Sequence, residues 1–402
     1  MASVTCTAPV NIAVIKYWGK RDTELILPTN DSLSVTLSQD ILHSKTSISA
    51  QAEFDQDRLW LNGKEEDITK NKRMHNCFRE TRALRRAMEE QDGSLPKLST
   101  FGVHVCSENN FPTAAGLASS ASGLAALVFA LAQLYKLPID MSDLSRIARQ
   151  GSGSACRSLF GGFVAWETGK EDDGSDSRAV QIAPDTHWPE LEALVCVVSD
   201  KKKGTSSTSG MQQTIESSPL MQERLRVVPG RMAAMTQAIL DRDFPAFAEL
   251  TMQDSNQFHS VCLDTYPPIF YLNDTSRGII QLIHAYNKLH GGYKAAYTFD
   301  AGPNAVIYAP KENMKEIIQL IHHYFPAGQD TPRDVYFSDP YQVFQDDAAS
   351  FDQPPAVNPE VIPIYPGGSV SRLLHTKVHD GPRVLAESDS LLTAEGLPKR
   401  TV

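Results

Sequence analysis

A run of small residues at 111–121, Phe-Pro-Thr-Ala-Ala-Gly-Leu-Ala-Ser-Ser-Ala, leads into an apolar segment with the length of a helix. Small side chains let an anion approach the backbone, and the free N–H groups and positive dipole end of a helix favour a phosphate there. The run matches neither the lysine-containing P-loop nor the GxGxxG fingerprint. Two interpretations are open: the run binds phosphate, or its small residues only permit close packing.

A second loop of small residues, at 151–156, ends at Arg157. Its serine hydroxyls and backbone amides precede a guanidinium group, which offers two parallel N–H donors to a carboxylate or a phosphate. The alternative interpretation is a turn in which Arg157 pairs with an acidic side chain for structural reasons. The presence of two such loops in one half of the chain favours anion binding.

Three cations, Lys16, Lys20 and Arg21, lie within six residues directly after an apolar stretch. They form a compact positive cluster on an acidic protein, in which 38 Lys and Arg against 48 Asp and Glu give a net charge of −10. The intervening Tyr17 and Trp18 could exclude water and so strengthen these charges. A solvated strand end explains the charges equally well, but it explains Trp18 less easily.

Asp300 follows an apolar stretch and precedes a Gly-Pro turn. A carboxylate in such a place can face a cleft and act as a general base. Aspartate before a turn is also common for local hydrogen bonding, so spacing alone leaves both interpretations open.

The composition is that of a globular protein that is not a general binder of nucleic acids. The 402 residues are 41% hydrophobic and 21% charged, which excludes a disordered or fibrous chain and favours two domains or one large composite. The net negative charge argues against broad affinity for nucleic acids or acidic membranes.

Two further sequence features bear on the compartment and on membranes. The six cysteines show no CxxC or zinc-type spacing, and the first residues lack a basic segment followed by an apolar one, so we expect reduced thiols and a cytoplasmic location. Residues 109–135 carry no charge and reach the length of a membrane span. Because the first half of this stretch is rich in Gly, Ser and Pro, we expect a buried helix at 124–134 instead.

The elements that must position these residues mix strands and helices. Strands are predicted at 4–14, 32–37, 59–61, 102–106 and 194–199. Helices are predicted at about 70–90 and 141–150, and around Ile279, Leu282, Ile283 and Tyr286. A hairpin is predicted from 295–299 and 305–308, with Asp300 at the end of its first strand. Residues 328–366 have weak periodicity, which indicates a long loop or insertion.

Taken together, these segments resemble the mevalonate diphosphate decarboxylase family, eukaryotic type, within the galactokinase, homoserine kinase and mevalonate kinase superfamily. The matching blocks run in family order at 8–22, 110–120, 151–162, 254–259 and 297–305. The resemblance implies an α+β fold of two subdomains, with ATP and substrate in the cleft between them. Residues 1–190 would form the ATP- and phosphate-binding subdomain, and residues 191–402 the second subdomain.

The resemblance also implies a reaction, in which mevalonate 5-diphosphate and Mg-ATP give isopentenyl diphosphate, ADP, phosphate and carbon dioxide on the route to isoprenoids and sterols. Asp300 would accept the proton of the substrate's 3-hydroxyl as that oxygen attacks the γ-phosphate. Arg157 would hold the substrate carboxylate. Lys16 would lie near Asp300 and keep it ionised, as an opposite charge at a few Å does. A homodimer is the expected assembly, without nucleic-acid or membrane partners.

The binding residues that the resemblance assigns fall into two sets. The set for the substrate and its diphosphate is Tyr17, Trp18, Gly19, Lys20, Arg73, Ser152, Gly153, Ser154, Ala155, Cys156, Arg157 and Ser207. The set around the ATP phosphates is Pro112, Ala115, Gly116, Leu117, Ala118, Ser119 and Ser120. The sequence assigns no ligands to the Mg²⁺ ion and no residues to adenine.

The chain departs from the family pattern at two places, and other functions stay open. His379 stands where relatives tend to have glycine, which puts the local backbone conformation in doubt, and Ser122 stands where they usually have alanine. The nearest rival is a kinase of the same superfamily that phosphorylates an alcohol without decarboxylating it. A catalytically silent binding or scaffold protein with the same fold is a further alternative, as is an RNA-binding protein, which the net charge disfavours.

Overall fold

The computed structural model describes residues 2–111, 119–198, 204–353, 355 and 358–399. The first of its sheets is built mostly from the amino-terminal third of the chain, in the strand order β17-β1-β6-β9-β7-β8. The strands are β1 (Ala2–Pro9), β6 (His43–Gln51), β7 (Arg58–Leu61), β8 (Lys64–Glu66), β9 (Gly102–Asn109) and β17 (Arg383–Val384). Asn62 and Gly63, both with positive φ, form the turn between β7 and β8.

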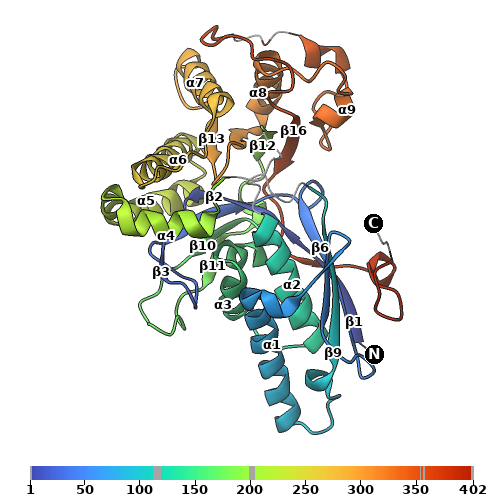
Figure 1. Ribbon diagram of the computed structural model, residues 1–402. Coiled ribbons are helices and arrows are strands. Elements are labelled where there is room, and N and C mark those ends of the chain that lie inside the picture. The colour runs from blue at the N-terminus through green and yellow to red at the C-terminus, as the bar shows by residue number, and fades with distance from the viewer. Residues whose placement is uncertain (1, 112–118, 199–203, 354, 356–357, 400–402) are drawn as a thin grey trace.

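Three helices pack on one another and against this sheet. They are α1 (Lys72–Gln91), α2 (Ser119–Tyr135) and α3 (Met141–Gly151), and α2 lies on β1 and β6 (Figure 1). Helix α2 is buried along most of its length, which confirms the predicted buried helix. Within the described ranges, no helix is both long and apolar enough to cross a membrane.

The second sheet includes β2, the strand that leads into the cationic cluster of Lys16, Lys20 and Arg21. Its antiparallel order is β11-β10-β5-β2, from β2 (Asn11–Ile15), β5 (Ser32–Thr36), β10 (Phe163–Trp166) and β11 (Ala179–Ala183). Lys16 follows the end of β2, and the short ribbon of β3 (Lys20–Asp22) and β4 (Leu27–Pro28) comes next. The 151–158 loop forms a 3-10 helix at Gly153–Leu159 rather than an open turn.

The third sheet belongs to the carboxyl-terminal half, with the order β13-β14-β12-β16-β15. Its strands are β12 (Leu191–Val197), β13 (Ala296–Phe299), β14 (Ala305–Pro310), β15 (Phe337–Ser338) and β16 (Arg372–Lys377). β13 and β14 form the predicted antiparallel hairpin, and Asp300 follows β13 directly. The fold is therefore α+β, as expected.

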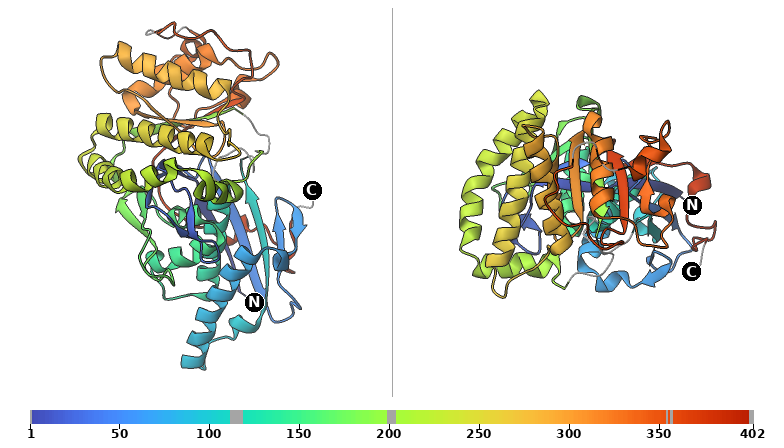
Figure 2. Two further views of the ribbon diagram at one scale, coloured as in Figure 1. Left: turned by 60° about the vertical axis from the view of Figure 1, so that its left-hand side comes forward. Right: turned by 90° about the horizontal axis from the view of Figure 1, so that it is seen from above.

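The helices of this half are α4 (Ser207–Ser217), α5 (Leu220–Asp241), α6 (Phe244–Asp264), α7 (Asp274–Leu289), α8 (Lys311–Tyr324) and α9 (Arg333–Tyr336). The sheet and α7 and α8 form one end of the molecule, and α4, α5 and α6 lie between that end and the first two sheets (Figure 1, Figure 2). Asp243 caps α6, and a capping box of Asn273 and Ser276 begins α7.

Two segments differ from the expected organisation. Residues 328–366 are largely irregular, but they include α9 and β15, and Phe337, Phe344 and Phe351 pack into the hydrophobic core. The carboxyl-terminal tail leaves the second subdomain, because β17 pairs with β1 and Leu392 packs on Trp60. The described part of this tail therefore contacts the first sheet, and the division at residues 190 and 191 stays a prediction.

Candidate active site

A cavity of about 490 Å³ lies where the second sheet, α2, α4, α6 and the end of β13 meet. Many of the residues that line it were predicted from the sequence, and they come from distant segments of the chain. The predicted residues that line it are Lys16, Tyr17, Trp18, Lys20, Arg73, Ser119, Ser120, Ser152, Gly153, Ser154, Arg157, Ser207 and Asp300. The chain thus brings together its cationic cluster, its serine loops and its candidate base.

Asp300 and Lys16 form an ion pair on the wall of this cavity. The Nζ of Lys16 lies 2.6 Å from Asp300 Oδ1, and the side-chain exposures are 3% for the lysine and 26% for the aspartate. Burial lowers the pKa of Lys16, and the charge of Asp300 acts in the opposite direction. The turn after Asp300 is closed by a backbone hydrogen bond, in which the N–H of Gly302 donates to the Asp300 carbonyl, rather than by the Asp300 side chain. The Asp300 carboxylate therefore faces the cavity with the predicted lysine beside it.

Arg157 is buried and is held by neutral groups. Its Nη1 donates to Ser32 Oγ at 2.5 Å, and its Nε donates to Ser34 Oγ at 3.0 Å and to Asn11 Oδ1 at 3.3 Å. Its guanidinium carbon lies 5.8 Å from the centre of the Trp166 ring. No ion pair joins it to a carboxylate of the described residues, so the structural-acid interpretation is wrong. The charge of Arg157 is available to an anion in the cavity.

Asn11 is a cavity residue that the sequence analysis did not single out. Its Nδ2 donates to Ser158 Oγ at 2.7 Å and to the Ser154 carbonyl at 3.1 Å, while its Oδ1 accepts from Arg157. It therefore fixes the guanidinium and the serine loop together. The available signal was an amide side chain at the start of β2, an otherwise apolar and fully buried strand.

Tyr17 and Gly153 fit against one aromatic ring. The Tyr17 and Trp166 rings meet edge to face with centroids 4.6 Å apart. A Cβ at Gly153 would lie 2.7 Å from the Trp166 ring and 2.8 Å from the Tyr17 ring. Glycine is required at this position because no side chain fits between the loop and the two rings.

Trp18 is a buried residue of the cavity wall. Its indole N–H donates to Thr214 Oγ1 at 3.0 Å, and its ring packs edge to face on Phe258. The side chain is buried and its donor is used, so Trp18 closes one wall of the cavity, and its contact with the substrate stays a prediction.

Three other predicted substrate-binding residues do not line the cavity. They are Gly19, Ala155 and Cys156, and the latter two are fully buried. The Cys156 thiol donates to the Gly153 carbonyl at 3.0 Å, and burial raises its pKa to about 12. These residues shape the backbone near the cavity. Gly19 has φ +91° and allows the turn that places Lys20.

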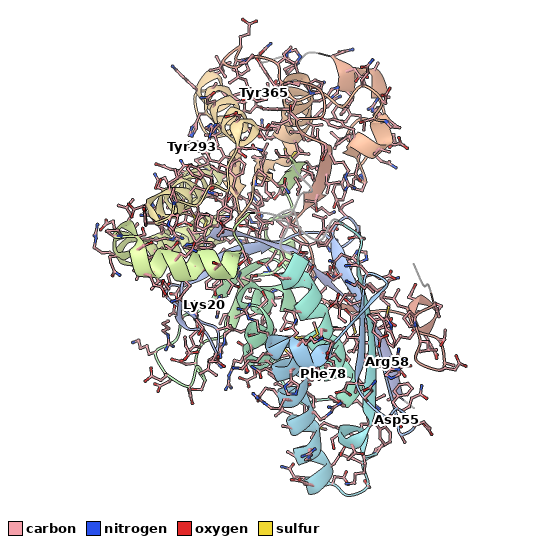
Figure 3. The ribbon with its side chains drawn as sticks, viewed as in Figure 1. Lys20, Asp55, Arg58, Phe78, Tyr293 and Tyr365 are labelled. Carbon is pink, nitrogen blue, oxygen red and sulfur yellow. The ribbon has the colours of Figure 1, made fainter. Side chains whose placement is uncertain are left out.

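Lys20 and Arg73 add two cations at the α4 side of the cavity. Lys20 is 8% exposed, and burial followed by the charge of Arg73 lowers its pKa to about 8. Arg73 Nη2 donates to Thr208 Oγ1 at 3.3 Å. Figure 3 places Lys20 next to α4, on the opposite side of the molecule from Arg58 and Asp55. Of the described residues that line the cavity, Asp300 is the one carboxylate, so the field there is strongly positive.

The structure describes only part of the predicted phosphate-binding loop. Ser119 and Ser120 line the cavity at the start of α2. The other residues predicted to bind ATP in this loop lie outside the described residues; they are Pro112, Ala115, Gly116, Leu117 and Ala118. On the opposite side, Ser207 is the first residue of α4, which Ser206 caps by accepting from Ser209 N at 3.1 Å.

The two departures from the family pattern are accommodated without distortion. Ser122 Oγ lies 2.7 Å from Ser44 Oγ in a buried hydrogen bond. His379 does not adopt positive φ, and its backbone N–H and carbonyl bond to Thr36 O and Gly162 N. No glycine is needed at position 379, because the backbone there is that of an ordinary residue.

The chain matches two family descriptions that together span most of its length. Residues 8–179 match the diphosphomevalonate decarboxylase-like N-terminal domain, and residues 193–385 match the mevalonate 5-diphosphate decarboxylase C-terminal domain. A diphosphomevalonate decarboxylase of Ganoderma lucidum is 60% identical over 400 residues, which is 98% of each chain.

Solved structures agree with these matches. A crystal structure of mevalonate 5-diphosphate decarboxylase has a TM-score of 0.88 and 51% identity, over 98% of this chain and 99% of that one. A complex of MDDEF with MVAPP, AMPPCP and magnesium has a TM-score of 0.74 and 30% identity, over 96% and 99% of the two chains. With this identity over nearly its whole length, the chain belongs to the diphosphomevalonate decarboxylase family of enzymes.

Proposed function

We propose that this enzyme converts mevalonate 5-diphosphate and ATP into isopentenyl diphosphate, ADP, phosphate and carbon dioxide, with Asp300 as the general base. The observation that carries the assignment of roles is that the Asp300 carboxylate and the unpaired guanidinium of Arg157 line one cavity with Lys16, Lys20 and Arg73. Such a cavity suits a substrate with a carboxylate, a diphosphate and one hydroxyl to be deprotonated.

In the first step, an oxygen of Asp300 accepts the proton of the substrate's tertiary 3-hydroxyl. The hydroxyl oxygen attacks the γ-phosphorus of ATP, and the bond to the β-phosphate oxygen breaks to release ADP. Hydroxide is a poor leaving group, and this transfer converts the hydroxyl into a phosphate ester that can leave. Phosphoryl transfer depends mainly on positioning and charge neutralisation, which the cationic cavity supplies.

In the second step, the C–O bond to the new phosphate breaks and its electron pair leaves with the phosphate. The bond between the carboxylate carbon and its neighbour supplies the electron pair of the new double bond, and carbon dioxide departs. Arg157 holds the carboxylate before this cleavage, since its two parallel donors match a carboxylate and its own contacts are all to neutral groups.

The remaining cavity residues form two groups, one that binds the substrate diphosphate and one that binds the ATP phosphates. Lys20, Arg73 and Ser207 bind the substrate diphosphate, and Ser152 and Ser154 bind beside Arg157. Ser119 and Ser120 meet the ATP phosphates at the start of α2, where the helix dipole favours an anion. By sequence, Pro112 and residues 115–118 complete that loop.

Mg²⁺ fits this cavity as a partner of the phosphates. The described residues contain no group of three or more His, Cys, Asp or Glu that could hold a metal ion. Mg²⁺ commonly binds through one or two protein oxygens together with substrate phosphates and water. The Ser119 and Ser120 hydroxyls and the Asp300 carboxylate are such oxygens, and the bound ion would neutralise charge on the transferred phosphate.

We also propose a homodimer in the cytoplasm. The dimer rests on the resemblance in sequence, and the reducing compartment agrees with six free cysteines that are all buried. Light scattering and cell fractionation test these two points.

The competing function is alcohol phosphorylation without decarboxylation. Arg157 favours the decarboxylase, because a simple kinase has no need for a buried guanidinium aimed at a carboxylate. The test is to incubate purified protein with mevalonate 5-diphosphate and Mg-ATP and to measure ADP and carbon dioxide together. The proposal expects equal amounts of the two products, and ADP without carbon dioxide would contradict it.

A further inference from the structure

Helix α6 contacts Lys16 and Phe299, the residue directly before Asp300, through two consecutive residues. Asp254 Oδ2 accepts from the backbone N–H of Lys16 at 2.7 Å. Ser255 Oγ accepts from the backbone N–H of Phe299, the residue directly before Asp300, at 3.1 Å. Figure 1 shows α6 beside β13 with β2 below it, and α6 packs on both strands. One helix turn thus holds two segments from different subdomains.

Asp254 is itself fixed by a buried cluster of charges. The side chains of Asp254 and Arg224 are both fully buried, with N–O distances of 2.9 and 3.0 Å between the guanidinium and the two carboxylate oxygens. Arg231 Nη1 makes a third contact with Asp254 at 3.2 Å. These partners leave the carboxylate a single orientation.

The same cluster holds the other side of Lys16. Arg224 Nη2 donates to the Lys16 carbonyl at 2.7 Å, and Asn30 Nδ2 donates to it at 3.0 Å. The N–H of Lys16 is bonded to Asp254 and its carbonyl to Arg224, so the backbone from which the ammonium extends is fixed at both groups. This arrangement limits the positions that Lys16 Nζ can reach.

Ser255 departs from the usual behaviour of a serine within a helix. Ser260 on the same helix donates to the carbonyl four residues earlier, that of Asn256, at 2.9 Å. Such bonds are typical of helical serines. Ser255 is 1% exposed, and its hydroxyl instead accepts from the last residue of β13. That hydrogen bond fixes the point at which Asp300 leaves the strand.

We propose that Asp254 and Ser255 are positioning residues, which together set the distance and orientation of Lys16 relative to Asp300 and so hold the base in its reactive place. The proposal rests on the proposed role of Asp300. A displacement of about 1 Å in a reacting group can cost on the order of 10²-fold in rate. Positions fixed by buried hydrogen bonds resist such displacement.

The main test compares Ser255→Ala with Ser260→Ala, the same substitution one and a half turns further along α6 and on its exposed side. For Ser255→Ala we expect kcat to fall about ten-fold while KM for both substrates changes less than about two-fold. This pattern is expected when a variant misplaces the reacting groups and leaves substrate binding intact. Ser260→Ala should match the wild type. An unchanged kcat for Ser255→Ala would overturn the proposal.

A second comparison separates positioning from general stability. In an Asp300→Asn background the positioned base is already lost, so adding Ser255→Ala should lower the residual kcat by less than about two-fold, because residues that act as a unit are non-additive. If Ser255 had only a structural role, Ser255→Ala would lower kcat by the same factor in both backgrounds, and that result would overturn the proposal.

Arg231→Gln covers the case in which Ser255→Ala does not fold. This variant removes one contact to Asp254 and leaves the buried Arg224 pair intact. It should lower kcat roughly three-fold with KM unchanged, and an unaltered kcat would count against Asp254 as a positioning residue. Wild-type protein that makes no carbon dioxide would instead contradict the proposed function, so the two failures are distinguishable.

Discussion

Lys16 Nζ lies 2.6 Å from Asp300 Oδ1, although 284 positions separate the two residues in sequence. The lysine follows β2 of the second sheet and the aspartate follows β13 of the third, so the ion pair forms only when the two halves of the chain meet. The proposed base and the proposed phosphate-binding cations are therefore assembled by tertiary structure, and the catalytic predictions follow from that assembly.

Arg157→Gln should lower kcat/KM for mevalonate 5-diphosphate by about 10²–10³-fold, the usual cost of losing one well-aimed donor. The guanidinium has no carboxylate partner in the described structure, so its charge is available for the proposed contact with the substrate carboxylate. Release of carbon dioxide from labelled substrate measures the effect.

Arg157→Lys should recover only part of the rate, because an ammonium lacks the planar pair of donors. Arg178→Gln is the matched control, since Arg178 is exposed and lies outside the cavity. Equal activity of Arg157→Gln and Arg178→Gln would exclude the proposed role of Arg157.

KM for mevalonate 5-diphosphate should rise between pH 7 and pH 9. Burial and Arg73 lower the pKa of Lys20 from 10.5 to about 8, so the free enzyme carries the charge below that pH and loses it above. If Lys20 binds the substrate diphosphate as proposed, binding needs the protonated lysine. Steady-state kinetics across this range measure the change.

Lys20→Arg should remove that rise, because a guanidinium stays charged throughout the range. If KM of Lys20→Arg climbs with pH as steeply as KM of the wild type, the dependence belongs to another group.

Gly153→Ala should destabilise the protein by about 1–3 kcal/mol and raise KM for the substrate, as overpacking does. The new Cβ would lie 2.7 Å from the Trp166 ring, which must move together with Tyr17. Gly93→Ala is the control, since a Cβ there meets no atom within 4 Å. Urea unfolding and substrate titration compare the two, and equal stability would contradict the steric argument.

Arg224→Met should lower the free energy of unfolding by about 3–5 kcal/mol, because it leaves the buried Asp254 with one cationic partner instead of two. Arg226→Met changes the same helix but breaks only an exposed pair with Glu223, so it should have little effect. Urea denaturation with tryptophan fluorescence measures both variants. A stable Arg224→Met protein would mean that the buried cluster contributes little to folding.

The sequence predicted the elements that carry the candidate site residues, because each has a local signal. The hairpin around Asp300 and the helix after the small-residue run occur as expected. The apolar stretch predicted as a strand at 4–14 forms two strands, β1 (Ala2–Pro9) and β2 (Asn11–Ile15), which belong to different sheets. The serine loop was also identified correctly as part of the cavity, although it forms a 3-10 helix.

Other features had no local signal. Helices α5 and α6 were not predicted, since buried polar residues such as Arg224, Asp254 and Ser255 interrupt their apolar pattern. Asn11 was missed because its partners Arg157 and Ser158 lie 146 and 147 positions away. The bond from the Trp18 N–H to Thr214 could not be predicted either, because it depends on the packing of α4 and α6.

The most direct measurement of the central claim is product formation by Asp300→Asn beside the wild type, with Asp173→Asn as an exposed control. The asparagine keeps the shape of the side chain and cannot accept the proton. We predict that this variant binds ATP normally and loses at least about 10³-fold in the rates of both ADP and carbon dioxide formation, while the control is unaffected. Wild-type turnover by Asp300→Asn would contradict the assignment of Asp300 as the base.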